Sequence, residues 1–135
     1  MNYAKTGSDS KQFLWRIGDW FPELGKDVLQ KLKIFYSQLL AANMVTNLIN
    51  VKAMANSDLV HFADCLLASR IVSKVAGAAT IYDVGSGNGF PALIYALLNP
   101  SAKIYFVESE DKKKKFVENA SEMMGIKNFF SISTN

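Results

Sequence analysis

The sequence predicts an α/β fold, with a partial parallel sheet of about three strands after a helical portion. The main observation is the order of segments between Ile81 and Glu108, where an apolar run, a glycine turn and two further apolar runs follow one another. A strand, a helix and a parallel strand in this order form a βαβ unit. An apolar stripe over residues 27–42 and a helix–strand pair over residues 111–133 extend the pattern. We expect residues 1–74 to form the helical portion and residues 75–135 the sheet, within one continuous domain.

Length and composition favour one globular, cytoplasmic domain. The chain has 135 residues, of which 50% are hydrophobic, and a formal net charge of +3. No apolar run approaches the roughly 18 residues that span a membrane. The single cysteine, Cys65, excludes an internal disulfide and fits a reducing compartment. His, Cys, Asp and Glu nowhere have the spacing of metal ligands, so we expect no metal site.

The first half of the chain carries helical patterns. Residues 12–24 are apolar at helical spacing up to Pro22, and we expect Trp15 and Trp20 both to pack against the rest of the domain. The next stripe is the clearest in the sequence and consists of Val28, Leu29, Leu32, Phe35, Tyr36, Leu39 and Leu40. Its period predicts a helix over residues 27–42 with these side chains in the core.

Asparagines interrupt the apolar pattern from Asn43 to Asn56, which predicts a loop with at most a short extended piece. A helix follows to about residue 73, with Asn56 and Ser57 suited to cap it. His61 and Asp64 are three residues apart on this helix and should share a face. Two interpretations stay open: Asp64 simply orients His61 at the surface, or the pair belongs to a functional site.

The turn between the first two strands favours a ligand. Gly85, Gly87 and Gly89 alternate along it, and glycine permits positive φ and close approach of a ligand to the backbone. Glu108 ends the next strand, where a carboxylate can accept two hydrogen bonds from a ribose diol. A dinucleotide fingerprint is Gly-x-Gly-x-x-Gly, whereas this turn reads Gly-x-Gly-x-Gly. A turn without any ligand is the weaker alternative.

After the second strand we expect a helix from Asp111 that ends before Gly125, and a third strand at residues 128–133. Four consecutive lysines, residues 112–115, occupy the first turn of this helix. They form either a solvated face or a contact with a phosphate-bearing partner.

Asp83-Val84-Gly85-Ser86-Gly87-Asn88-Gly89 resembles motif I of the Rossmann-like S-adenosylmethionine-dependent methyltransferases. This resemblance implies a partial Rossmann-like methyltransferase fold and S-adenosylmethionine as the cofactor. The residues that it implies for cofactor binding are Asp83, Gly85, Ser86, Gly87, Asn88, Gly89, Phe90, Glu108 and Ser109.

A narrower resemblance, to the glucose-inhibited division protein B family, rests on motifs in one order. They are Asn47-Leu48-Ile49-Asn50-Val51, His61-Phe62-Ala63-Asp64, the glycine turn continued by Phe90-Pro91, and Glu108-Ser109 followed by lysines. The family methylates a guanine ring nitrogen of small-subunit ribosomal RNA. The resemblance therefore implies this RNA as partner and Asn47, His61 and Asp64 as catalytic residues beside the cofactor.

The chain departs from the family in several places. Ala92 stands where the family favours glycine, and Thr134 where arginine is common. The family continues for several more strands, so we expect a shortened chain whose first strand is an exposed edge of the sheet. Two functions follow: a methyltransferase acting on ribosomal RNA, or an inactive cofactor-binding module that covers this edge by forming a homodimer or pairing with another chain.

Overall fold

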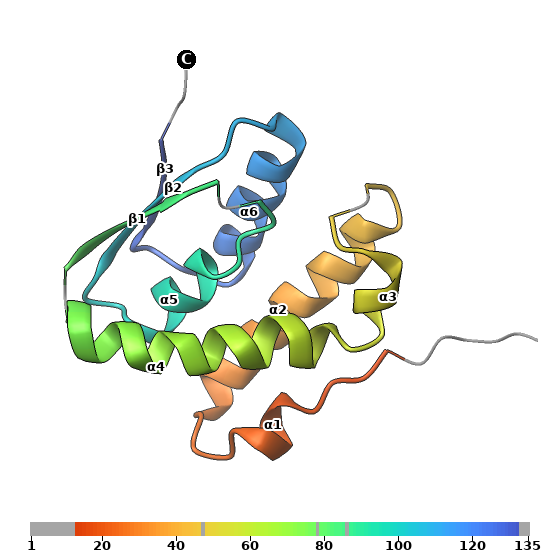
Figure 1. Ribbon diagram of the computed structural model, residues 1–135, viewed down its shortest axis with the longest axis horizontal. Coiled ribbons are helices and arrows are strands. Elements are labelled where there is room, and N and C mark those ends of the chain that lie inside the picture. The colour runs from red at the N-terminus through yellow and green to blue at the C-terminus, as the bar shows by residue number, and fades with distance from the viewer. Residues whose placement is uncertain (1–12, 47, 78, 86, 133–135) are drawn as a thin grey trace, which may run out of the picture.

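The computed structural model describes residues 13–46, 48–77, 79–85 and 87–132, and it has a helical portion packed against a small sheet (Figure 1). The helices before the sheet are α1 (Ile17–Trp20), α2 (Lys26–Asn43), α3 (Val51–Met54), the π-helical turn η1 (Asp58–Ala63) and α4 (Asp64–Ala76). The elements that follow are β1 (Thr80–Val84), α5 (Ala92–Leu98), β2 (Lys103–Val107), α6 (Asp111–Met123) and β3 (Phe129–Ile132).

The described strands form one parallel sheet in the order β1-β2-β3. The predicted α/β class and the three parallel strands are therefore confirmed, with β1 at an edge. One face of the sheet is covered, because Ile104, Phe106 and Phe129 are buried beneath α5 and α6. The opposite face carries Tyr82, Tyr105 and Phe130 in one register row, with neighbouring ring centroids 5.3 Å apart. Tyr82 is 63% exposed, so this second face is open at β1.

The core joins the helical portion to the sheet. The expected stripe of α2 is confirmed, since Leu32, Phe35, Tyr36 and Leu39 are buried. Phe35 lies against Phe62 of η1 and Phe90 of the turn after β1, at centroid distances of 5.3 and 4.8 Å. Helix α2 also packs on α5 and α6, which places it across both helices that cover the sheet.

The N-terminal helix is shorter than the apolar spacing predicts, since α1 has four residues. Trp15 packs as expected, with its ring 4.6 Å from Tyr36. The expectation for Trp20 is wrong, because this side chain is 41% exposed. The guanidinium of Arg16 lies over its ring at 4.6 Å, so a cation–π contact takes the place of core packing.

The segment between α2 and α4 also differs from the prediction. Asn50 starts a short helix, α3, instead of an extended piece, because its side-chain oxygen accepts a hydrogen bond from the N–H of Lys52 at 2.9 Å. Ser57 is buried and does not cap the next helix. That helix begins with the π turn η1, in which the N–H of Asp64 donates to the carbonyl of Leu59, five residues back.

No helix among the described residues is both long and apolar enough to cross a membrane.

Replacing Phe62 by alanine tests the aromatic core. Phe62 is fully buried and touches rings from α2, the N-terminal segment and the turn after β1. We expect Phe62→Ala to lower the free energy of unfolding by about 3–5 kcal/mol, measured by urea denaturation. The control Phe13→Ala removes an exposed ring and should change it by less than about 0.5 kcal/mol. Equal effects of the two substitutions would contradict this description of the core.

Candidate functional site

The turn after β1 has the backbone that its glycines predict. Gly85, Gly87 and Gly89 have φ angles of +78°, +58° and +92°. The N–H of Gly85 still donates to the carbonyl of Val107 at 2.9 Å, so the turn leaves the sheet directly at the end of the β1–β2 ladder. It then enters α5, for which Pro91 is the N-cap residue.

These glycines serve two purposes. A Cβ at Gly89 would lie 2.9 Å from Cδ1 of Leu93 and 3.3 Å from Cγ2 of Val117, so packing excludes a side chain there. A Cβ at Gly85 or Gly87 would meet nothing within 4 Å. The core therefore explains Gly89, whereas the first two glycines leave open space over the backbone, as close approach of a ligand requires.

Glu108 connects the end of β2 to this turn. Its Oε1 accepts a hydrogen bond from the N–H of Glu110 at 2.9 Å, and its Oε2 accepts one from the N–H of Gly87 at 2.7 Å. The hydrogen bond from Glu110 lowers the pKa of Glu108; burial opposes this shift and the bond from Gly87 adds to it. A backbone hydrogen bond from Ser109 contributes as well. Glu108 is therefore ionised at neutral pH. A carboxylate has about four acceptor positions, so Glu108 can still accept from a further donor such as a hydroxyl group of a ribose.

His61 approaches the turn through Phe90. The rings of His61 and Phe90 are stacked, with centroids 5.2 Å apart and planes 24° apart. Phe90 also stacks on Phe35, so its ring is shared between α2 and η1. Burial lowers the pKa of His61, which keeps the imidazole neutral, and the carboxylate of Asp64 opposes that shift. Nε2 of His61 is buried and has no hydrogen-bond partner among the described residues.

The structure brings together some, but not all, of the expected site residues. Asp83 lies near the end of β1, and the exposed Ser109 follows Glu108. Asp64 is exposed at the start of α4, and no hydrogen bond between described atoms joins it to His61. Asn47 and Ser86 lie outside the described residues.

Two asparagine side chains, which the sequence motifs do not single out for this role, hold the loop after α2. Oδ1 of Asn43 accepts hydrogen bonds from the N–H groups of Leu48 and Ile49 at 2.8 and 2.9 Å. Nδ2 of Asn88, within the glycine turn, donates to the carbonyl of Leu48 at 3.4 Å. The glycine turn therefore contacts the loop of the first family motif. The asparagines between positions 43 and 56 were the available signal, because asparagine side chains commonly bond to nearby backbone.

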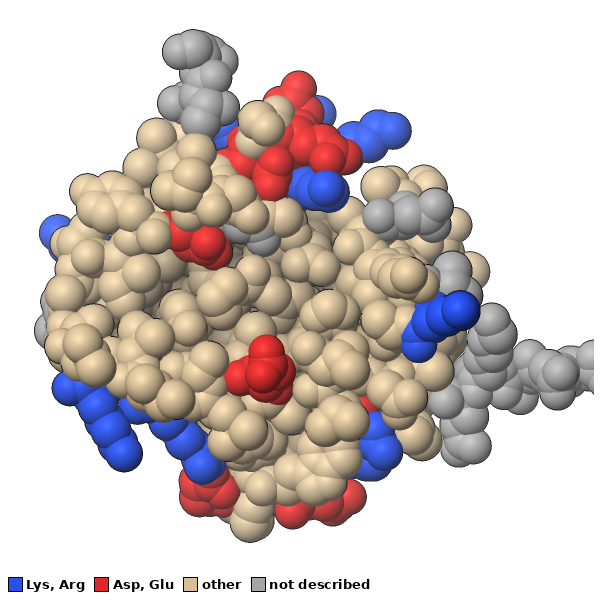
Figure 2. Space-filling model, viewed as in Figure 1, with Lys and Arg blue, Asp and Glu red and all other residues tan. Residues whose placement is uncertain are grey.

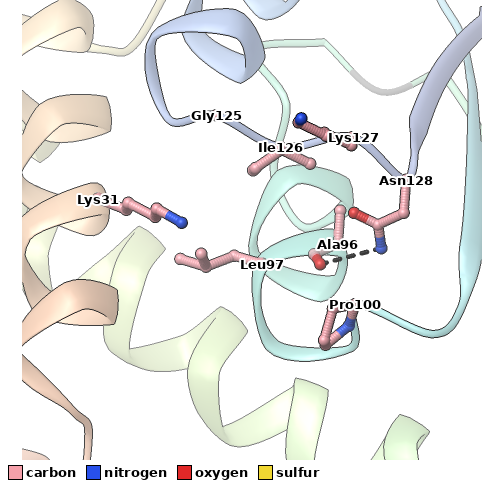
Figure 3. Close-up of a pocket in the computed structure, with 8 residues that line it drawn as sticks. All are labelled: Lys31, Ala96, Leu97, Pro100, Gly125, Ile126, Lys127 and Asn128. Carbon is pink, nitrogen blue, oxygen red and sulfur yellow. Dashed lines mark hydrogen bonds between the residues drawn. The ribbon is translucent and has the colours of Figure 1, made fainter.

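A pocket of about 380 Å³ opens near the end of the sheet at which β2 and β3 begin (Figure 3). Lys31, Leu97, Pro100 and Lys127 contribute to its lining, and Asn128 donates to the carbonyl of Ala96 at 3.1 Å. Pro100 and Lys127 precede β2 and β3, whereas the glycine turn and Glu108 follow β1 and β2. This pocket is therefore separate from the glycine-turn site. The described residues contain no group of three or more His, Cys, Asp or Glu side chains that could hold a metal ion.

The four lysines lie at the start of α6, next to Glu108. Lys112 and Lys115 are exposed, and Lys113 pairs with Glu110 at 2.8 Å. Lys112 and Lys115 are therefore accessible to solvent or to a charged partner.

A parallel sheet with a glycine turn after β1 and a carboxylate after β2 defines an α/β protein, and this arrangement is typical of those that bind nucleotides at the carboxyl ends of their strands. Residues 28–135 match the family model GidB, described as rRNA small subunit methyltransferase G. The chain therefore belongs to the GidB family, as the sequence motifs predict.

Two curated relatives show the extent of the match. Ribosomal RNA small subunit methyltransferase G 3 of Bdellovibrio bacteriovorus is 40% identical over 84% of this chain and 52% of its own length. Ribosomal RNA small subunit methyltransferase G of Dichelobacter nodosus is 34% identical over 80% of this chain and 49% of its own length. The chain spans about half the length of these relatives.

A solved structure of coclaurine N-methyltransferase, bound to N-methylheliamine and SAH, aligns with 54% of this chain and 22% of its own. Its TM-score is 0.48 and the sequence identity is 16%, values that support no inference about this chain.

Alanine at the glycines should separate packing from backbone effects. At Gly89 the new Cβ clashes and φ is positive, so we expect Gly89→Ala to destabilise the protein by more than the roughly 1–3 kcal/mol of a strained backbone alone. Gly87→Ala meets open space and should cost only that backbone term. Urea denaturation of both variants measures the difference. Equal losses would mean that packing around Gly89 imposes no constraint.

Proposed function

We propose that this chain binds S-adenosylmethionine at the glycine turn and acts as a methyltransferase on a guanine of small-subunit ribosomal RNA. The observation that carries the proposal is the open backbone at Gly85 and Gly87 beside the ionised Glu108. Membership in the GidB family supports the same reading, because both curated relatives above are named ribosomal RNA methyltransferases.

The residues at the turn fit this cofactor. Its ribose carries hydroxyl donors, and Glu108 can still accept a hydrogen bond beside those from backbone N–H groups. Its amino acid part needs room close to the backbone, which Gly85 and Gly87 provide. On the family resemblance, Asp83, Ser86, Asn88, Gly89, Phe90 and Ser109 complete the cofactor site.

The proposed reaction requires no general acid or base from the protein. When bound, S-adenosylmethionine supplies an activated methyl group. The target nitrogen of guanine has a free lone pair on the major-groove edge, so its methylation removes no proton and needs no general base. The protein contributes positioning, which requires reacting atoms held about 3 Å apart. We assign this role to Asn47, His61 and Asp64, and the contact of Asn88 with the loop that follows Asn47 supports a shared site.

The same proposal covers partner, location and organisation. The exposed lysines at the start of α6 are suited to phosphates of the RNA. A ribosomal RNA substrate and a single, buried free cysteine favour the cytoplasm. We also propose that residues 1–74 and 75–135 form one continuous domain, because a single cluster of buried side chains contains members of both segments.

The second candidate is a cofactor-binding module without activity that forms a homodimer through the edge of the sheet. The observation that favours it is the exposure of β1, where Tyr82 is 63% and Val84 78% exposed. Figure 2 shows the face over α4 and β1 made mostly of uncharged residues, with acidic atoms near its centre and many of the charged residues toward the rim. A mostly uncharged surface beside an edge strand is suited to association with a second copy of the chain.

Removing the Glu108 carboxylate should weaken cofactor binding. We expect Glu108→Ala to raise the Kd for S-adenosylmethionine by about 5- to 150-fold, the equivalent of about 1–3 kcal/mol, in isothermal titration calorimetry. The control Glu122→Ala removes an exposed carboxylate at the other end of α6 and should leave the Kd unchanged. Equal affinity of the parent and Glu108→Ala would mean that the ribose is not held at β2, and no heat with the parent would reject the cofactor.

Methyl transfer separates the two candidates. With labelled S-adenosylmethionine, we expect the protein to label small-subunit ribosomal RNA that lacks the modification and not RNA that already carries it. Cofactor binding without transfer, together with a dimer in sedimentation that Tyr82→Lys converts to a monomer, would support the module instead. Tyr82 is suited to this test because its ring is exposed and lies outside the glycine turn.

A further inference from the structure

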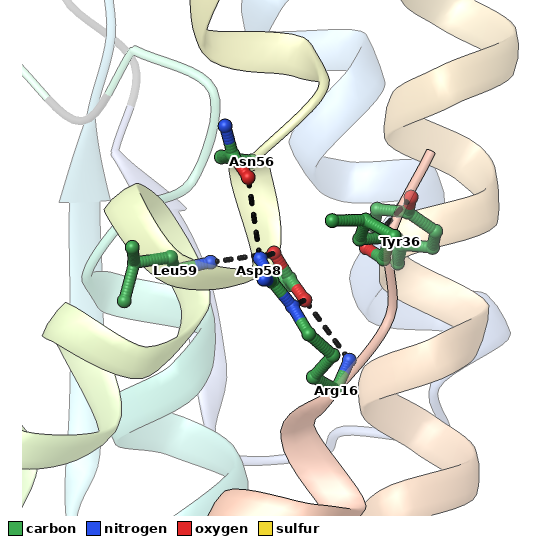
Figure 4. A network of polar contacts seen from close by, with 6 residues as sticks. Arg16, Tyr36, Asn56, Asp58 and Leu59 are labelled. Atoms are coloured by element: carbon green, nitrogen blue, oxygen red, sulfur yellow. Dashed lines mark hydrogen bonds and ion pairs between the residues drawn. The ribbon is translucent and has the colours of Figure 1, made fainter. Parts of the chain in front are cut away.

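Asp58 begins the π turn that carries His61, and it is fully buried. Its carboxylate accepts four hydrogen bonds, each 2.9 Å long (Figure 4). Three come from Arg16, through its backbone N–H, Nε and Nη2, and the fourth comes from the N–H of Leu59. About four acceptor positions exist on a carboxylate, so the group is fully satisfied. The pairing spans 42 residues of sequence and joins the N-terminal segment to η1.

The N-terminal segment is itself fixed to α2. The ring of Trp15 lies against Tyr36, whose hydroxyl donates to the carbonyl of Leu14 at 3.2 Å. Arg16 is further held by its contact with the ring of Trp20 and by a bond from Nη2 to Oδ1 of Asn56 at 3.3 Å. Arg16 is therefore a fixed anchor for Asp58.

A π turn needs such an anchor. This conformation is rare and closes each hydrogen bond over one more residue than an α-helix does, so an unrestrained segment favours α-helical bonding. A π-helix turns by less than the roughly 100° per residue of an α-helix, so relaxation of η1 would rotate its residues about the helix axis, by more for each residue after Asp58. His61 is three residues after Asp58. Rotation of His61 about the helix axis would therefore move its ring out of the stack with Phe90.

We propose that the ion pair between Arg16 and Asp58 is a positioning device that fixes the π turn and thereby holds the ring of His61 against Phe90, beside the glycine turn. The second observation behind this proposal is Nε2 of His61, which is buried without a described partner. Buried polar atoms are normally hydrogen-bonded, so this one fits a group that a bound ligand supplies. That last step rests on the proposed function, whereas the effect of the ion pair on the ring does not.

The single histidine makes the proposal directly measurable. His61 is the one histidine of the 135-residue sequence, so untagged protein gives one set of imidazole signals in a ¹H–¹³C NMR spectrum. In the parent, stacking on Phe90 should shift these signals, and burial should keep the titration midpoint below the ordinary value of about 6.5. The carboxylate of Asp64 raises the pKa of His61 and is the charged group that affects it among the described residues. Every variant retains Asp64, so this contribution is the same in all of them.

Two substitutions break the anchor in different ways. Asp58→Asn keeps the shape of the side chain and removes its charge, and Arg16→Lys keeps the charge and removes the branched donor. We expect the His61 signals of each variant to lose their ring-current shift and the midpoint to rise toward about 6.5. Glu23→Gln is the matched control, because it breaks the exposed ion pair of Glu23 with Arg70 on α4 and leaves η1 untouched. The control should keep the parent signals and midpoint.

Unchanged His61 signals and midpoint in folded Asp58→Asn would overturn the proposal. If circular dichroism shows that this variant is unfolded, Arg16→Lys is judged by the same criterion. A shift in Glu23→Gln as large as in the anchor variants would also overturn it, since any loosening of the N-terminal segment would then suffice. The NMR measurements require no cofactor. Failure of the parent protein to bind S-adenosylmethionine would therefore reject the proposed function, and the test of the ion pair would remain valid.

Discussion

The stack of Phe35, Phe90 and His61 is the contact on which the arrangement of this protein depends. Phe90 follows the glycine turn directly, and its ring packs against residues of the helical portion, so it connects the two. Phe35 fixes one face of the ring from the longest helix, and His61 lies stacked on it from η1. Aromatic contacts of this kind add about 0.5–1.5 kcal/mol beyond the burial of their area. The glycine turn and the His61 segment are therefore fixed relative to each other through one side chain.

Glu108 supplies the polar counterpart of this contact. Its bond to the N–H of Gly87 closes the turn from the sheet side, where β2 ends. The turn is thus held by a carboxylate on one side and by Phe90 on the other, although no described atom beyond the chain neighbours lies within 4 Å of a Cβ placed at Gly85 or Gly87. A rigid backbone with free space above it is preorganised for a ligand, because little conformational entropy remains to be lost on binding.

The sequence predicted those features that depend on local pattern. The period of the α2 stripe predicts its buried face, and the alternating glycines with Glu108 predict the β1–α5–β2 unit. The π turn was not predictable, because the spacing of Leu59, Phe62 and Ala63 also fits one face of an ordinary α-helix. The pairing of Arg16 with Asp58 leaves no local signal either, since its partners are 42 residues apart. Trp20 was misjudged because sequence does not reveal that Arg16 covers its ring.

The unusual features of this structure are concentrated around one segment. Asp58 carries its charge inside the protein: burial tends to raise its pKa, and the hydrogen bonds of Arg16 outweigh that effect and lower it. The segment that starts there is π-helical, and it contains a histidine whose Nε2 is buried without a described partner. The π conformation and the buried nitrogen each oppose stability, and the charge of Asp58 would do so without its bonds to Arg16. The positioning of His61 that we propose accounts for the occurrence of all three features in the six residues Asp58–Ala63, next to the glycine turn.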